Sequence, residues 1–468
     1  MRIFLISTNT ATSPYPVYPL GCSVVAESLT LAGHEVRVFD CFMELEKSGG
    51  VDEMLQEFDC EICEFNPGLI GVSIRNIDNV NALEEEIFLD IPKRIIDISK
   101  RIFPEVPTVL GGSGYSIMPE EMLAAIGADY GVAGEGEHAS VALAATLERG
   151  EKPQKRIMGR LGAETADSPT PLQGKNILGA EYFPELAKLY NKAGCVMPVQ
   201  TKRGCSNHCV YCTYPFLEGR ELRCRPPKEV VADMVELHEE HGADMIFFTD
   251  SVFNDAAGKY LDLIEAIEAA KLDIPWTAFF QPDPDLTNKL VDRLVAVGLH
   301  SVELGPDATT DTTLKSIGKS FNFDDVVRCN ELFAGKNIAV ANYFMMGVPG
   351  ETEATAKLGV ENIGKLDMSV SFVFLGIRIL PGTPLFRIAV NEKIISADAP
   401  MLDPVYYFSP GLDRTWLEEY LEQTLSRIKH CVYPPNSMDS GIRILRQMGY
   451  RGNLWEMMVK NSRRLPKS

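Results

Sequence analysis

Short apolar runs alternate with amphipathic segments along the chain from residue 196 onward. Each apolar run has the length of a β-strand, and the segments between the runs have the period of a helix. Strands that alternate with helices pair in parallel, because each helix carries the chain back to the same edge of the sheet. Six such units predict a partial parallel (β/α)6 barrel over residues 196–390, with its functional groups at the carboxyl ends of the strands. The predicted strands are residues 196–201, 244–250, 275–280, 301–304, 338–346 and 370–378.

Residues 1–150 show the same alternation in a form that predicts an open sheet. Five short apolar runs are separated by helical segments, which is typical of a doubly wound α/β domain with parallel strands. Glycines and small polar residues follow the strands, at the edge where such sheets bind ligands. The predicted strands are residues 3–6, 36–39, 69–73, 108–110 and 130–133.

The other two regions have weaker patterns. Residues 151–195 carry several prolines and little sustained apolar period, which predicts a linker between the two α/β domains. Residues 391–468 contain helical segments, and we expect a small C-terminal helical region that caps the barrel and contacts substrate.

Composition narrows the classes of protein. The formal net charge of −20 disfavours a nucleic-acid partner, which is bound mainly through phosphate contacts with Lys and Arg. No run approaches the roughly 18 consecutive apolar residues that a membrane-spanning helix needs. A disulfide framework is not expected in a chain of this length without a signal peptide. We therefore predict a cytoplasmic protein without a transmembrane segment.

Cys205, Cys209 and Cys212 follow the first predicted barrel strand with the spacing C-x3-C-x2-C. A [4Fe–4S] cluster that is bound only by protein usually takes four thiolates. Three clustered cysteines would leave one iron open to a small molecule. The loop therefore predicts an iron–sulfur cluster, and we expect Lys202 and Arg203 beside it to balance the cluster charge.

A zinc site is the main alternative for these cysteines. Structural zinc usually takes four ligands arranged as two pairs, and no second pair of that character is evident. Cys60 and Cys63 form a C-x2-C, but their segment is acidic and helical, so we expect them to serve packing. His208 is expected to be an ordinary loop residue, because a fourth protein ligand would close the open iron.

With Tyr211 just before its third cysteine, the loop resembles the cluster loop of the radical S-adenosylmethionine (SAM) enzymes. In that family SAM binds the open iron through its amino and carboxylate groups and is cleaved to a 5′-deoxyadenosyl radical, within a partial TIM-type barrel. The turns after the second, fourth, fifth and sixth predicted strands also resemble family motifs, although Asp307 and Ala308 stand where Glu and Ser are common. The SAM contacts that the resemblance implies are Tyr211, Asp250, Ser251, Asp307, Gly347, Pro349, Gly350 and Arg378.

The glycine-bearing turns of residues 1–150 resemble the Rossmann-like cobalamin-binding domain that precedes many radical SAM domains. No G-x-G-x-x-G follows the first strand, which disfavours a dinucleotide site. The motif D-x-H-x-x-G, which supplies a histidine to cobalt, is absent around His34 and His138. Two possibilities remain: cobalamin without a histidine ligand, which we favour, or a domain that binds no corrin. The implied cobalamin contacts are Pro19, Leu20, Gly21, Ser73, Arg75, Asn76, Gly111, Gly112, Gly134, Glu135 and Gly136.

The resemblance implies a cobalamin-dependent methyltransferase of class B. Methylcobalamin would methylate a substrate carbon radical, and a second SAM would remethylate cob(I)alamin. Three alternatives stay open: a cyclisation, rearrangement or oxidation without methyl transfer; methylthiolation of RNA or protein, for which this chain lacks further cysteines and a basic domain; and a regulatory protein that binds both cofactors without catalysis. No catalytic residue beyond the cluster is assigned. We expect a small-molecule or lipid-like substrate and an electron donor such as flavodoxin or ferredoxin.

Overall fold

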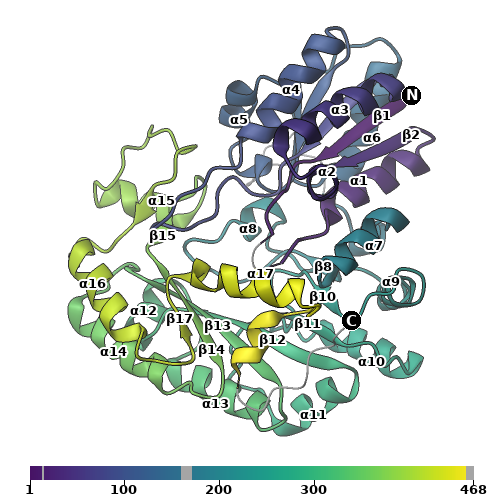
Figure 1. The fold of residues 1–468 in the computed structure, drawn as a ribbon. Helices are drawn as coiled ribbons and strands as arrows, with labels where there is room; N and C mark the ends of the chain where they lie inside the picture. Colours follow the sequence, from purple (N-terminus) through teal and green to yellow (C-terminus); the bar gives the residue numbers. More distant parts are fainter. Residues whose placement is uncertain (13–14, 160–170, 460–468) are drawn as a thin grey trace.

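A computed structural model describes residues 1–12, 15–159 and 171–459. Two α/β domains lie one above the other (Figure 1), with the N-terminal domain above the curved sheet of the second domain. Within the described residues, no helix is long and apolar enough to cross a bilayer.

The N-terminal sheet has six parallel strands in the order β2-β1-β3-β4-β5-β6. Their alternating side chains supply two cores. Ile3, Leu5 and Leu69 pack on one face, and Phe4 and Ile6 pack on the other. The strands are β1 (Arg2–Ser7), β2 (Glu35–Asp40), β3 (Leu69–Ser73), β4 (Thr108–Gly111), β5 (Tyr130–Ala133) and β6 (Ile157–Gly159).

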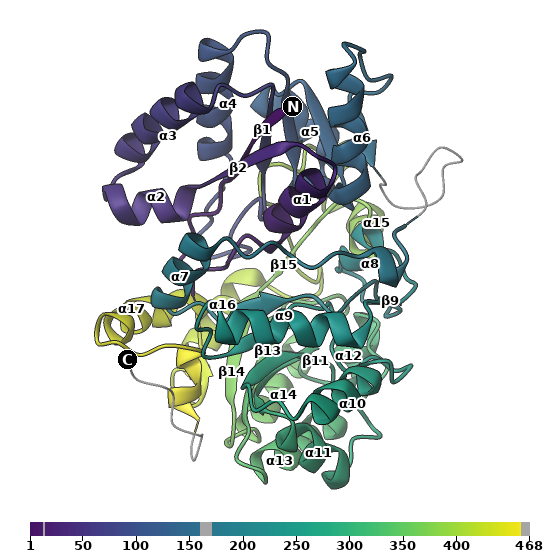
Figure 2. The same ribbon diagram turned by 90° about the vertical axis from the view of Figure 1, so that its right-hand side faces the viewer.

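Helices cover both faces of this sheet. Figure 2 shows α1 (Leu20–Leu31) and α6 (Gly136–Glu148) on one side. The other side carries α3 (Val51–Phe65), α4 (Asp90–Ile102) and α5 (Pro119–Ile126), with α2 (Cys41–Ser48) between β2 and α3. The five predicted strands are confirmed, and the sheet is parallel as expected.

The segment 151–195 holds more structure than a linker. The three-residue strand β6 pairs in parallel with β5 and extends the N-terminal sheet. Helix α7 (Pro184–Lys192) follows and packs its buried face against Phe42 and Tyr18 of the N-terminal domain. Neither element has enough length or apolar period to be recognised from its residues alone.

The second domain is a curved parallel sheet with the strand order β17-β14-β13-β12-β11-β10-β7. The six predicted strands are all present and neighbour one another in chain order, which confirms the partial barrel. A further strand, β17 (Cys431–Val432), comes from the C-terminal region and pairs with β14. The six are β7 (Met197–Val199), β10 (Ile246–Phe248), β11 (Trp276–Phe280), β12 (Leu299–Asp307), β13 (Ala339–Met346) and β14 (Val370–Leu375).

The last predicted strand, 370–378, is shorter than expected. It ends at Leu375, because Gly376 adopts the left-handed φ of 69° and turns the chain. The next two residues form β15 (Ile377–Arg378), which pairs in antiparallel fashion with β16 (Tyr406–Tyr407) in a separate sheet. The turn at Gly376 therefore directs Arg378 away from the barrel sheet.

Helices cover the outer face of the barrel (Figure 2). They are α9 (Pro227–Glu239), α10 (Tyr260–Ala270), α11 (Asn288–Ala296), α13 (Phe323–Ala334) and α14 (Glu353–Gly364). The C-terminal region adds α16 (Arg414–Leu425), which packs on α14, and α17 (Asp439–Gln447). Trp455, in the short 3-10 helix η4 (Leu454–Met458), packs on Ala339 and Val370 at the amino ends of β13 and β14. This end of the inner face is therefore filled.

The loop 74–89, between β3 and α4, joins the two domains. Asp78 accepts a hydrogen bond from Arg378 Nε at 2.8 Å, and each side chain is only 3% exposed. The same guanidinium donates to the carbonyl oxygens of Ile379 and Met401. The loop thus brings a buried carboxylate to a buried cation of the other domain.

Replacing Asp78 should weaken the whole fold. In Asp78→Ala the Arg378 charge stays buried without its partner, which costs about 3–5 kcal/mol. The matched control is Asp52→Ala, whose carboxylate is 76% exposed and pairs with Arg94 at the surface; such pairs contribute less than about 1 kcal/mol. Urea unfolding of both variants measures the difference, and equal losses would contradict the role assigned to Asp78.

Candidate cofactor sites

A cavity of about 290 Å³ lies between the N-terminal sheet and helices α1 and α6. Its wall consists of apolar side chains from β1, β3, β4 and β5, including Leu5 and Val109. Gly71 of β3 also lines the cavity, and a Cβ there would lie 2.7 Å from Leu5 Cδ2, so the end of the Leu5 side chain would have to move. The cavity lies at the carboxyl ends of the strands. The helices that follow β1 and β3 there cover opposite faces of the sheet, and ligands are expected at such a position.

Most of the predicted cobalamin contacts meet at this cavity. Gly112, in the turn after β4, adopts a φ of 99°, and a Cβ there would lie 2.4 Å from the Ile74 carbonyl oxygen. Pro19, Arg75 and Asn76 do not line the cavity, and the last two have exposed side chains beyond its edge. The residues that line it are Leu20, Gly21, Ser73, Gly111, Gly112, Gly134, Glu135 and Gly136.

The barrel domain closes the far end of the cavity. Helix α8 (Tyr214–Leu217) starts two residues after the third cysteine, and its Tyr214 and Leu217 line the cavity. Gln200 and Arg203, which precede the first cysteine, line it as well. A ligand that fills the cavity would therefore lie next to the cysteine loop.

Three other segments brace the cysteine loop through its backbone. The Cys205 amide donates to Gly219, the Val210 amide donates to Ile317, and the Leu385 amide donates to Val210. Leu385 belongs to α15 (Pro384–Asn391), which follows the last strand of the barrel in the sequence. These bonds hold the three cysteines in one buried or half-buried loop.

The thiol set fits three irons of a [4Fe–4S] cluster. Each iron of such a cluster takes its own thiolate, so the three sulfurs need not converge on one point. Within the described residues, no three His, Cys, Asp or Glu side chains are arranged around a single ion. Burial raises the pKa of Cys209 and raises that of Cys212 to about 12. A bound metal would have to displace these protons, because it binds the thiolate form.

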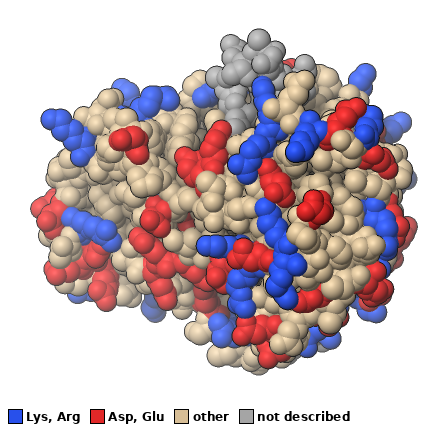
Figure 3. Space-filling model, turned by 90° about the horizontal axis from the view of Figure 1, so that it is seen from above, with Lys and Arg blue, Asp and Glu red and all other residues tan. Residues whose placement is uncertain are grey.

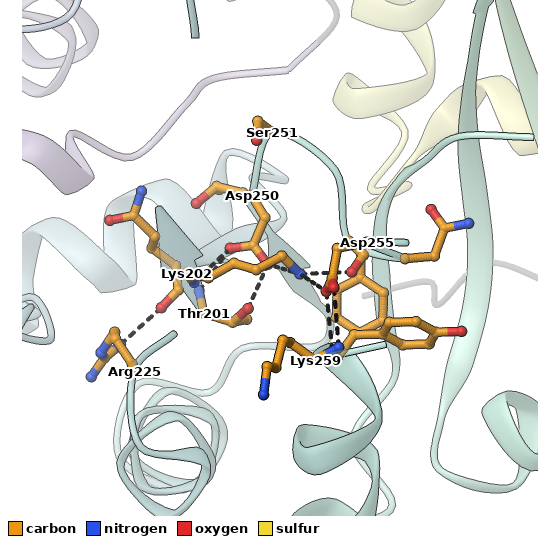
Figure 4. A network of polar contacts seen from close by, with 12 residues as sticks. Thr201, Lys202, Arg225, Asp250, Ser251, Asp255 and Lys259 are labelled. Carbon is orange, nitrogen blue, oxygen red and sulfur yellow. Dashed lines mark hydrogen bonds and ion pairs between the residues drawn. The ribbon is translucent and has the colours of Figure 1, made fainter. Parts of the chain in front are cut away.

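The charges predicted to balance the cluster have other partners. The Lys202 ammonium lies 3.4 Å from Asp250 and 3.3 Å from Asp255, and it donates to the Phe253 carbonyl oxygen (Figure 4). Arg203 pairs with Glu137 of the N-terminal domain at 2.6 Å. The expectation for both residues is therefore wrong: they hold the base of the loop in place.

Asp250 lies in the same network rather than in an open position. Its carboxylate accepts hydrogen bonds from the amides of Thr201 and Lys202, at 2.8 and 3.1 Å, and from the Thr201 hydroxyl. With three hydrogen bonds accepted and the Lys202 ammonium 3.4 Å away, most of this carboxylate's capacity is already used within the protein. Ser251 points away from this network (Figure 4), and its hydroxyl donates to the Gly204 carbonyl oxygen.

Asp307 and Tyr211 meet beside the cysteines. The Tyr211 hydroxyl donates to Asp307, and the Lys319 ammonium pairs with the same carboxylate. Asp307 has a left-handed φ of 64°, a conformation that costs a non-glycine residue of order 1–3 kcal/mol and is common at functional sites. Burial alone would lower the pKa of Lys319, but Asp307 and Cys209 raise it overall, so the side chain stays cationic.

Lys319 is a site residue that was not among the predicted SAM contacts. It stands twelve residues beyond Asp307, at the end of the segment after the fourth barrel strand that resembles a family motif. Only the structure shows its place in the site, because the Ile317 carbonyl oxygen, two residues before it, accepts a hydrogen bond from Val210 of the cysteine loop.

The turn after β13 is shaped by one buried acid. Glu351 accepts hydrogen bonds from the amides of Gly347 and Val348, and its other oxygen has no partner among the described residues. Gly347 adopts a φ of 91°, and a Cβ there would lie 2.9 Å from the Phe408 ring. The predicted SAM residues Gly347, Pro349 and Gly350 thus share one turn at the carboxyl edge of the barrel. Arg378 does not join them, because Asp78 and two carbonyl groups occupy its guanidinium.

Comparison with known families gives two matches. The family model described as "B12 binding domain" matches residues 6–144, and the model of the "Radical SAM superfamily" matches residues 199–358. The first range contains the cavity glycines, and the second contains the three cysteines.

Individual relatives cover most of the chain. The tryptophan 2-C-methyltransferase of Streptomyces laurentii is 26% identical over 434 residues, covering 78% of this chain and 71% of the relative. The hopanoid C-3 methylase of Methylococcus capsulatus is 26% identical over 324 residues, covering 65% and 57%. The solved structure of the radical SAM methyltransferase TsrM from Kitasatospora setae, with cobalamin and a [4Fe–4S] cluster bound, has the same fold, with a TM-score of 0.80, 24% identity and coverage of 98% and 97%.

Glu351 should make stability depend on pH. Burial raises the pKa of Glu351 from 4.5 to about 7, against the opposing effect of the two amide donors. The folded protein therefore binds this proton more tightly than the unfolded chain, and the resulting stability is full below pH 4.5 and lost as the pH rises through about 7. We expect this loss to reach about 3 kcal/mol in the free energy of unfolding.

Urea titrations across this range measure the slope of stability against pH. Glu351→Gln should be less pH-dependent than the unmodified protein by that amount. The control is Glu361→Gln, an exposed position on α14, which should leave the slope unchanged. An unchanged slope in Glu351→Gln would show that the buried acid does not hold the proton.

Proposed function

Because the chain belongs to the radical SAM superfamily and carries a B12-binding domain before its barrel, we propose that it methylates a carbon of a small-molecule or lipid-like substrate. The two domains imply a [4Fe–4S] cluster, SAM and cobalamin, which together supply an electron, the methyl donor and the methyl carrier. One observation carries the proposal: the cavity of the B12-binding domain ends at Tyr214 and Leu217, directly after the cysteine loop.

The residues of the chain have separate tasks in this proposal. Cys205, Cys209 and Cys212 would hold the cluster, and the glycine turns of the N-terminal sheet would hold cobalamin in the cavity. Tyr211, Asp307 and the turn at Gly347 would lie along SAM. The braced loop and the buried domain contacts would keep water from the reacting atoms.

Two relatives support a small-molecule or lipid-like substrate, since one acts on tryptophan and another on a hopanoid. Lys and Arg side chains are interspersed with Asp and Glu on the face seen in Figure 3, which supports a protein without a nucleic-acid partner. Flavodoxin or ferredoxin remains the proposed electron donor, and the cytoplasm the proposed location.

Methyl transfer is tested by anaerobic turnover. The reconstituted protein is incubated with trideuteromethyl-SAM, a low-potential reductant and a small-molecule extract, and products are analysed by mass spectrometry. We expect the labelled methyl group in one product of the extract, together with S-adenosylhomocysteine. Label confined to methionine, with 5′-deoxyadenosine formed and no labelled product of the extract, would favour a cyclisation, rearrangement or oxidation instead. Unchanged SAM would favour a regulatory protein.

The two cofactor sites should be separable by mutation. Gly21 lines the cavity, and a Cβ there would meet nothing within 4 Å, so Gly21→Phe adds a ring to the cavity lining without a clash at Cβ. We expect this variant to lose cobalamin absorbance and keep its iron content. Cys209→Ala should keep cobalamin absorbance and lose iron. Gly364→Phe, at an equally open position on α14, is the control and should keep both cofactors. Cobalamin retained by Gly21→Phe would contradict the assignment of the cavity.

A further inference from the structure

The inner face of the barrel keeps accessible surface near its carboxyl end. Along β13 and β14 the outward side chains are fully buried under helices, as Phe344 and Val373 show. The inward side chains Tyr343, Met345 and Phe372 alternate with them and are only half-buried. Because η4 fills the amino end, this surface opens toward the cofactor sites.

Aromatic rings form a band across the inner face. Phe247 of β10 contacts Phe279 of β11 edge to face, with the ring centres 5.1 Å apart. Phe279 lies 6.4 Å from Tyr343 of β13, which stacks on Phe372 of β14 at 5.3 Å with an interplanar angle of 14°. Four of the five strands from β10 to β14 thus contribute a ring. Phe247 is buried, whereas Phe279, Tyr343 and Phe372 are half-buried, and their accessible faces suit a further flat ring.

The middle strand, β12, contributes an acid to the band. Glu303 pairs in register with Phe279 on one side and with Ala341 on the other, and its side chain is 3% exposed. The Tyr343 hydroxyl donates to its Oε2 at 2.9 Å. Among the described residues, no Lys or Arg forms an ion pair with it. A buried carboxyl group without a cation is stable only when its oxygens accept hydrogen bonds, and Tyr343 supplies one such bond, to Oε2.

The pKa of Glu303 reflects its burial and the groups around it. Burial raises the pKa of Glu303 to about 7, with the nearby Glu456 adding to the effect and Tyr343 opposing it. Tyr15, from the loop between β1 and α1, lies within electrostatic range of both Glu303 and Arg75. A loop of the B12-binding domain therefore lies near this acid.

We propose that this aromatic band binds the substrate as a planar aromatic ring whose N–H group donates a hydrogen bond to Glu303. The inference rests on the proposed function, since it names the substrate class of the same site. A phosphate or carboxylate would be repelled by the acid, and a purely hydrocarbon lipid would offer no donor to the oxygen of Glu303 that Tyr343 does not bind. A flat ring with one donor satisfies both the band and Glu303.

The test compares two bicyclic rings with the reconstituted full chain. Indole carries an N–H donor, and benzothiophene has nearly the same shape without one. Calorimetry should show indole binding at least about tenfold more tightly, because a buried acceptor that loses its donor costs that much. Equal affinities for the two rings would overturn the inference.

Variants assign the preference to Glu303. We expect Glu303→Leu to bind both rings equally, and Tyr343→Phe, which keeps the ring and removes the hydroxyl, to retain the preference for indole. Glu361→Leu, at an exposed position of α14, is the matched control and should behave as the unmodified protein. An indole preference that survives Glu303→Leu would overturn the inference. If Glu303→Leu does not fold, judged by circular dichroism and cobalamin absorbance, Glu303→Gln replaces it and should reduce the preference.

The two proposals fail in different ways. Labelled methyl transfer to a non-aromatic compound, without selective indole binding, would overturn the substrate class and leave the methyltransferase standing. Glu303-dependent indole binding without transfer of the labelled methyl group would overturn the methyltransferase and leave the proposed ligand class standing.

Discussion

The carboxylate of Asp250 is the contact on which the cofactor region depends. It lies two residues beyond the end of β10 and accepts hydrogen bonds from the amides of Thr201 and Lys202, so it fixes the chain just before the cysteine loop. The buried Lys202 ammonium then links Asp250 to Asp255, which lies in the same loop between β10 and α10. Charges this far from water are stable only when each has a partner, so the three side chains form one unit. This unit sets the direction of the cysteine loop. It also directs Arg203 toward the other domain.

The same logic explains the junction between the domains. Glu135 was expected to contact cobalamin, and it does line the cavity, but its carboxylate also faces Arg223 and Arg203 of the barrel domain. Arg203 in turn pairs with Glu137. The turn after β5 therefore combines two roles: its glycines shape the cavity wall, and its acids join that wall to the strand that carries the cluster.

Apolar runs and spacing were enough to predict the strands and the cysteine loop, because both depend on residues close together in the sequence. The roles of Asp250 and Arg378 were not predictable in this way. Each has the residue type and strand-end position of a ligand contact, yet each is used by a partner that is remote in sequence: residue 201 for Asp250 and residue 78 for Arg378. Glu303 escaped notice for the opposite reason, since a single acid within a strand carries no pattern until the neighbouring strands supply their rings.

The loop 74–89 has a mechanical consequence. Arg75 stands at its start, beyond the edge of the cavity, and Asp78 is buried against Arg378 three residues later. So short a connection cannot stretch, and a hinge between the domains would have to expose two charges that are now out of contact with water. The distance between the corrin side and the barrel is therefore held constant while reactants come and go. Exchange of substrate therefore has to use a path that leaves the Asp78–Arg378 pair intact and the two domains at a fixed separation.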